Sequence, residues 1–160
     1  MLRVHIVHVG TIKEKYLSDA VAEYEKRLSA YCAVDNISVK EERLSDKPSA
    51  TEIANAVKKE GERILSAIPP RAYIIALCVE GGQMSSEAFS ARLTEIANLG
   101  FSEICLIIGG SDGLSDEVKK SAKMRLSISE MTFPHQLMRV ILLEQLYRAF
   151  NISAGGKYHK

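Results

Sequence analysis

Two glycine turns follow apolar runs in this sequence, and they are the first candidates for binding chemistry. Glu80-Gly81-Gly82 comes after the run Tyr73–Val79, and Gly109-Gly110-x-x-Gly113 comes after Ile104–Ile108. Glycine lets the backbone approach a ligand closely or turn with positive φ. The second turn is not a phosphate-binding loop, since no Gly-Lys-Ser/Thr follows, and it does not match the dinucleotide fingerprint. It is therefore either a backbone-lined ligand site or a plain tight turn, which glycine also favours.

A third candidate is Ser127–His135, which passes from a predicted strand into the start of a predicted helix. Its exposed amides and small hydroxyls can hold an adenosine or a carboxylate, although an ordinary capped helix start has the same composition. His135 lies near the helix N-terminus, where the dipole opposes protonation, so a structural role is the simpler interpretation. Arg139 lies four residues further on and therefore shares a helix face with His135.

Basic residues gather toward the C-terminus. From Lys119 onward the sequence has eight Lys and Arg against two Glu, a net +6, although the whole chain carries only +1. The tail Lys157-Tyr158-His159-Lys160 adds an aromatic ring and an imidazole. Cations hold phosphates and rings stack on unpaired bases, so both features suit an RNA partner. A solvated basic face and a frayed terminus remain as alternatives.

Length and composition predict one soluble globular domain over residues 1–160, with 46% hydrophobic and 26% charged residues. No apolar run approaches the roughly 20 residues of a membrane span, and no cleavage site follows Leu2–Val9. We therefore expect a cytoplasmic protein. Cys32, Cys78 and Cys105 form no C-x-x-C pair, so neither a zinc site nor a disulfide is expected. Cys78 and Cys105 are best explained as small buried hydrophobes.

Alternating strands and helices must position these segments. Apolar runs predict strands at Leu2–Val9, Val34–Val39, Tyr73–Val79, Ile104–Ile108 and Arg125–Ser129. Spacing and capping residues predict helices over about 14–31, from Thr51 to Pro69, from Ser85 or Ser86 to Gly100, from Ser115, and from Pro134 to about Phe150. This order predicts an α/β domain with a mainly parallel sheet covered by helices. Ligands of such sheets bind beyond the carboxyl ends of the strands, where both glycine turns lie.

The last predicted helix has hardly any polar face, because apolar residues dominate Leu137–Phe150. A helix that is apolar all round must be covered on all sides. A domain of this size offers few such places to its terminal helix. The sequence therefore predicts a homodimer in which a second subunit supplies the cover.

Long segments of the chain together resemble one known family. They are Val7–Gly10, Leu106–Leu114, Leu126–Ser129, Met131–Phe150 and Tyr158–Lys160. The chain is similar over essentially its whole length to the family of ribosomal RNA large subunit methyltransferase H, in the SPOUT class. That resemblance implies an α/β fold with a C-terminal trefoil knot and an obligate homodimer. It also implies methyl transfer from S-adenosylmethionine, without a metal, to N3 of a pseudouridine in 23S rRNA of the assembled ribosome.

The resemblance also implies which residues do the work. Those of the cofactor pocket are Leu77, Gly109, Ile128, Ser129, Glu130, Met131, Thr132 and Phe133. Because N3 of pseudouridine carries a proton, the reaction needs a base or cations that stabilise the anion. Arg139 is the candidate for stabilising charge or holding phosphate. His159 is the candidate base or base-edge contact, with Tyr158 stacking on the substrate, and the tail of one subunit can complete the site of its neighbour.

Three other functions fit parts of the sequence. A non-catalytic ribosome assembly factor would keep the basic surface and the dimer without methyl transfer. A flavodoxin-like nucleotide-binding domain would fit the α/β pattern, although no phosphate loop supports it. A SPOUT methyltransferase acting on tRNA is the third, and the absence of an added RNA-binding domain argues weakly against it.

Overall fold

The structure, a computed structural model, describes all 160 residues and contains one five-stranded sheet. The strands are β1 (Leu2–Val9), β2 (Cys32–Val39), β3 (Tyr73–Gly82), β4 (Glu103–Ile108) and β5 (Met124–Leu126). They are ordered β2-β1-β4-β3-β5, and every pair is parallel. The predicted α/β class with a parallel sheet is confirmed.

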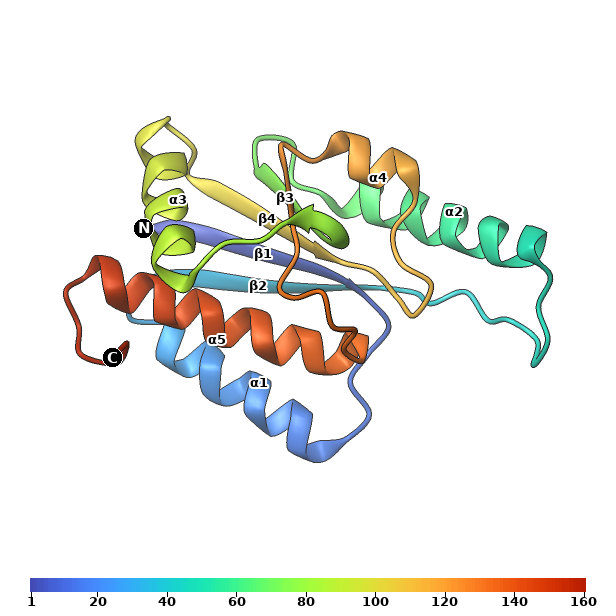
Figure 1. The fold of residues 1–160 in the computed structure, drawn as a ribbon, viewed down its shortest axis with the longest axis horizontal. Helices are drawn as coiled ribbons and strands as arrows, with labels where there is room; N and C mark the ends of the chain where they lie inside the picture. The colour runs from blue at the N-terminus through green and yellow to red at the C-terminus, as the bar shows by residue number, and fades with distance from the viewer.

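Helices cover both faces of the sheet (Figure 1). One layer consists of α1 (Lys15–Leu28), α3 (Ser86–Asn98) and α5 (His135–Ser153), with α5 packed between the other two. The opposite layer consists of α2 (Ala50–Ala67) and the short α4 (Asp116–Ser121). None of these helices has the length and hydropathy that a membrane crossing requires.

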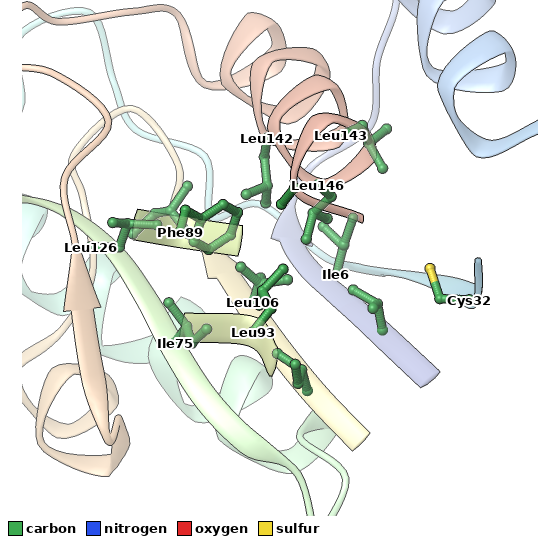
Figure 2. Packing of buried hydrophobic residues seen from close by; sticks show 14 of the residues in the cluster. Ile6, Cys32, Ile75, Phe89, Leu93, Leu106, Leu126, Leu142, Leu143 and Leu146 are labelled. Atoms are coloured by element: carbon green, nitrogen blue, oxygen red, sulfur yellow. The ribbon is translucent and has the colours of Figure 1, made fainter. Parts of the chain in front are cut away.

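Alternation along the central strands gives each layer its own core. On β4, Ile104, Leu106 and Ile108 belong to the cluster under α1, α3 and α5, whereas Cys105 and Ile107 face α2 and α4. In Figure 2 the labelled residues of three neighbouring strands, Ile6, Leu106 and Ile75, lie together beneath side chains of α3 and α5. The central strands are therefore buried on both faces, as their continuous apolar runs predicted.

The structure corrects several predicted boundaries. The N-cap of α2 is Ser49, not Thr51, and it forms a capping box with Glu52. Gly81 and Gly82 belong to β3 itself, because the register with β5 shifts between Leu77 and Gly82 and keeps the strand paired. The fifth strand ends at Leu126, and α5 continues three residues beyond Phe150. Cys105 is fully buried as predicted, but Cys78 is only half-buried, because its part of β3 extends beyond the covered sheet.

Ser49→Ala should lower the free energy of unfolding by about 1 kcal/mol, as expected for loss of an N-cap side chain. The hydroxyl of Ser49 accepts a hydrogen bond from the Glu52 amide at 3.1 Å, and nothing else is placed to replace it. Urea unfolding followed by circular dichroism measures the change. Ser66→Ala, at an exposed position near the other end of α2, is the control and should cost less than about 0.5 kcal/mol. Equal costs for both variants would contradict the capping role.

Candidate active site

A hollow that we call the main cavity lies at the carboxyl ends of β3, β4 and β5 and has a volume of about 760 Å³. Three segments form its walls: the end of β3 from Leu77 to Glu80, the turn Ile108–Leu114, and the connection from Leu126 to the start of α5. Of the eight residues predicted for the cofactor, seven line it, namely Leu77, Gly109, Ile128, Ser129, Met131, Thr132 and Phe133. Glu130 is exposed and does not line it. Ser111 and Asp112 also line it, although neither was predicted to bind the cofactor, because their turn was expected to vary.

The turn after β4 folds back on itself so tightly that Gly109 has no room for a side chain. A Cβ at this position would lie 2.8 Å from the carbonyl oxygen of Gly113 and 2.9 Å from its carbonyl carbon. Gly113 has a φ of +85°, and its amide donates to the carbonyl of Gly110 at 3.1 Å. The glycines are therefore required by a closed backbone loop that forms one wall of the main cavity.

The connection between β5 and α5 uses its hydroxyls to hold its own shape. Ser127 Oγ donates to the carbonyl of Ser129 at 3.0 Å, and Ser129 Oγ accepts from the amide of Met131 at 3.0 Å. The helix α5 then begins without a side-chain cap and without an acidic residue in its first turn. Its first amides are therefore free to meet an acceptor group at this end of the main cavity.

The rim of the main cavity carries one ion pair and one thiol. Lys119 pairs with Glu80, and that hydrogen bond lowers the pKa of the Glu80 carboxyl. Cys78 lines the wall beside them, and burial, followed by the charge of Glu80, raises the pKa of its thiol. Nowhere in the chain do three His, Cys, Asp or Glu side chains converge as they would to hold a metal ion.

Arg139 lies beside the main cavity and does not line it. It lines a smaller hollow together with His8, and a third, much smaller hollow shares Arg139 with it and shares Ile108 and His135 with the main cavity. Burial and then the nearby charge of Arg139 lower the pKa of His8 to about 4, so this imidazole is neutral at neutral pH. Its Nδ1 hydrogen therefore donates to the carbonyl of Gly10 at 2.9 Å.

The predicted residues Tyr158 and His159 lie at the opposite end of α5, in a hydrogen-bonded group that we call the tail cluster. Its other members are Glu144 and Arg148 of α5 and Glu87 of α3. Tyr158 donates to Glu144 Oε1 at 3.1 Å, and Arg148 Nη2 donates to the same oxygen at 2.6 Å. The tail is therefore held in place and does not extend freely into solvent.

The contacts of His159 define its tautomer. Arg148 can only donate, so the 3.1 Å contact to His159 Nδ1 makes that nitrogen an acceptor. The hydrogen then sits on Nε2 and donates to Glu87 Oε1 at 2.6 Å, which lowers the pKa of Glu87. Both ring nitrogens are thus occupied in this arrangement.

Within one chain the structure does not bring the tail cluster to the main cavity. The cavity contains His135 and Met138 at the start of α5, whereas the cluster is built on Glu144 and Arg148 further along the same helix. Glu144 and Arg148 lie nine and thirteen residues after His135, roughly 14 and 20 Å along the helix at 1.5 Å per residue. Sequence reasoning missed Glu144 and Arg148, for which the only available signal was their i, i+4 spacing.

Comparison with known proteins relates this chain to a set of methyltransferases. A family described as predicted SPOUT methyltransferase matches residues 2–159. A protein of Exiguobacterium sibiricum named ribosomal RNA large subunit methyltransferase H is 47% identical over 159 residues, covering 99% of this chain and 100% of its own. Proteins of the same name from Bacillus pumilus and Streptococcus suis are 48% and 46% identical with the same coverage.

Solved structures share the fold at low sequence identity. A probable methyltransferase of Bordetella pertussis superimposes with a TM-score of 0.59 at 14% identity, over 93% of this chain and 96% of its own. The tRNA (m1G37) methyltransferase of Aquifex aeolicus gives a TM-score of 0.52 at 13% identity, over 92% of this chain and 69% of its own.

Proposed function

The chain belongs to the SPOUT methyltransferase family and to its group of ribosomal RNA large subunit methyltransferase H, and from this we propose that it methylates N3 of a pseudouridine in 23S rRNA. The observation that carries the proposal is identity of 47% over 159 residues, the full length of a relative with that name. Identity at this level over the full length of both chains favours the same substrate as well as the same chemistry.

S-adenosylmethionine is the methyl donor in this proposal, and the main cavity is suited to it. A volume of about 760 Å³ lies within the usual range for small-molecule sites, and most of its wall is backbone and apolar side chains. Leu77, Gly109 and Ile128–Phe133 would hold the adenine and the methionine part. The donor supplies an electrophilic methyl group on a sulfonium sulfur, which the site must align with N3, and alignment alone can be worth several kcal/mol, roughly 7 to 11 at most.

The acceptor must lose a proton as the methyl group arrives, because N3 of pseudouridine is protonated at neutral pH. His159 is proposed to receive that proton or to contact the base edge, with Tyr158 shaping the base pocket. Since both nitrogens of His159 are engaged by Arg148 and Glu87, the substrate has to displace one of these contacts first. Arg139, which lines the smaller hollow beside the main cavity, is the candidate for stabilising charge or for holding phosphate.

A homodimer would bring these groups together. On α5 the apolar side chains of Leu137, Val140 and Ile141 remain only half-buried, which leaves a surface for a second copy. If the two α5 helices cross with opposite directions, the tail cluster of one subunit lies near the main cavity of the other. Sedimentation at twice the 17.7 kDa chain mass is the expected result. The knot, the single-domain organisation and a cytoplasmic location are further parts of this proposal.

Methyl-labelled S-adenosylmethionine tests the function directly. Separate reactions contain unmethylated assembled ribosomes, free large subunits or bulk tRNA, and nucleoside mass spectrometry identifies the product. We expect 3-methylpseudouridine with assembled ribosomes only, because the assembled ribosome is the substrate that the resemblance to this family implies. Methyl label in tRNA would instead assign the protein to the SPOUT methyltransferases that act on tRNA. No label despite cofactor binding would favour a non-catalytic assembly factor.

Cys78 provides a second, independent test of the cavity. Burial raises the pKa of Cys32 to about 11 and of Cys105 to about 12, so in the native protein a disulfide reagent should modify only Cys78 rapidly. S-adenosylhomocysteine, the reaction product, should slow that modification at least about tenfold, because Cys78 lines the main cavity. Cys78→Ser should abolish the fast phase. If S-adenosylhomocysteine does not change the modification rate of Cys78, the cofactor binds elsewhere.

A further inference from the structure

The smaller hollow that contains Arg139, here called the side hollow, lies between the carboxyl ends of β1 and β2 and the first turns of α1 and α5. It has a volume of about 320 Å³. Its lining residues are His8, Thr11, Ile12, Ser18, Val21, Asn36, Ser38 and Arg139. Most of these side chains are polar and none is a carboxylate, whereas much of the main cavity wall is apolar.

Arg139 has no hydrogen-bond or ion-pair partner in this structure. Its Nε atom is buried and unsatisfied, and burial lowers the pKa of the guanidinium. The acidic side chain whose charge it feels is Glu25, which is itself engaged by the amide of Asn36. A half-buried guanidinium usually has a carboxylate or phosphate partner, because its donors are costly to leave unpaired. Arg139 therefore lacks an anion that the chain does not supply.

The other polar residues of the side hollow do not neutralise the positive charge of Arg139. His8 is neutral and donates to the Gly10 carbonyl, which also accepts from Ser38 Oγ at 2.9 Å. Thr11 and Ser18 present exposed hydroxyls at the rim of the side hollow. The helix α1 begins at the N-cap residue Glu14 without a side-chain capping hydrogen bond, and its first turn contains no acidic residue.

We propose that the side hollow binds one phosphate group of the substrate RNA backbone, with Arg139 as its charged donor and the Thr11 and Ser18 hydroxyls beside it. The inference rests on the proposed function, which supplies a polyanionic substrate to the adjoining main cavity. A third, much smaller hollow shares Ile108 and His135 with the main cavity and Arg139 with the side hollow, so the two hollows are neighbours. A nucleotide whose base enters the main cavity would therefore have its own or a neighbouring phosphate near the side hollow. Arg139 is thereby assigned to hold the substrate, and the charge that develops at N3 is left to other groups.

The decisive measurement is the salt dependence of binding to unmethylated ribosomes. Arg139→Gln removes the charge, and Ser38→Asp places a carboxylate in the side hollow from an exposed position on β2. Loss of one phosphate contact should weaken binding about tenfold and reduce the slope of log K against log salt by about 0.7 to 0.9. Lys58→Gln, the same charge loss on the exposed side of α2 on the opposite face of the sheet, should leave the slope unchanged. Affinity for S-adenosylhomocysteine should stay within about twofold in all three variants, which verifies the fold.

A titration with inorganic phosphate tests anion binding in the side hollow independently of the proposed function. Millimolar phosphate should shift the His8 ring proton in the NMR spectrum of the wild-type protein but not of Arg139→Gln. Equal slopes of log K against log salt in all variants would overturn the proposal. A shift of the His8 signal by phosphate, without any effect of the variants on ribosome binding, would overturn it too. In that case the side hollow would bind free phosphate and not the RNA backbone. If the wild-type protein itself fails to bind ribosomes, the proposed function fails, and the phosphate titration alone decides whether the side hollow binds an anion.

Discussion

Gly109→Ala should raise the dissociation constant for S-adenosylmethionine by about tenfold to a hundredfold. The new Cβ would lie 2.8 Å from the carbonyl oxygen of Gly113, and because both partners are backbone, neither can rotate away. Relief of the clash has to open the loop that forms a wall of the main cavity, and strain of this kind costs about 1 to 3 kcal/mol. Isothermal titration calorimetry with the cofactor measures the effect.

Gly82→Ala is the matched control for this variant. It makes the same chemical change on a neighbouring strand, but its Cβ would meet only the carbonyl oxygen of Arg125 at 3.9 Å, an ordinary contact. Cofactor affinity should therefore stay within about twofold of the wild-type value. An unchanged affinity in Gly109→Ala would show that the loop after β4 does not hold the cofactor.

His159→Ala should lower the methylation rate at saturating substrate by about 10² to 10⁴, the usual contribution of a positioned proton acceptor. Cofactor affinity should not change, because His159 is assigned to the substrate and the residues proposed to hold the cofactor lie on other segments of the main cavity wall. Lys157→Gln alters an exposed residue of the same tail and serves as the control. A rate for His159→Ala that equals the wild-type rate would remove this residue from the chemistry.

Mixing Gly109→Ala with His159→Ala asks whether the tail acts on its own subunit or on the neighbouring one. If the partner's tail completes each site, a mixed dimer contains one intact site, and random exchange of equal amounts should restore about a quarter of the wild-type activity. If each tail serves its own chain, no combination has an intact site and the mixture stays inactive.

The fold could largely be predicted from the sequence because its central strands are buried on both faces. Ile104–Ile108 and Tyr73–Val79 are continuous apolar runs, which are typical of parallel strands buried on both faces. Predictions were poorer where tertiary pairing decides. Gly81 and Gly82 look like a turn, but pairing of Gly82 with Leu126 keeps them in β3. Ser49 and Thr51 are both suitable caps, and only the local geometry selects Ser49.

The candidate site was predictable to the extent that glycine marks it. A pocket built from backbone has little side-chain signature, so Gly109 and its loop were the main physical signal, and the remaining residues were assigned by resemblance. The state of Arg139 could not be foreseen, because its lack of a partner depends on side chains from β1, β2 and α1. The tail cluster likewise depends on how Tyr158 and His159 fold back onto Glu144 and Arg148, which no local pattern encodes.

The length of α5 has a consequence for how the enzyme behaves when it is scarce. Because roughly 20 Å of rigid helix separates His135 at the main cavity from Arg148 in the tail cluster, a single chain carries both halves of the proposed site but does not bring them together. A lone subunit would then keep its affinity for the cofactor and lose its turnover. Below the dissociation constant of the pair, the reaction velocity would rise with the square of the protein concentration, and the cellular abundance of the protein would itself set its activity.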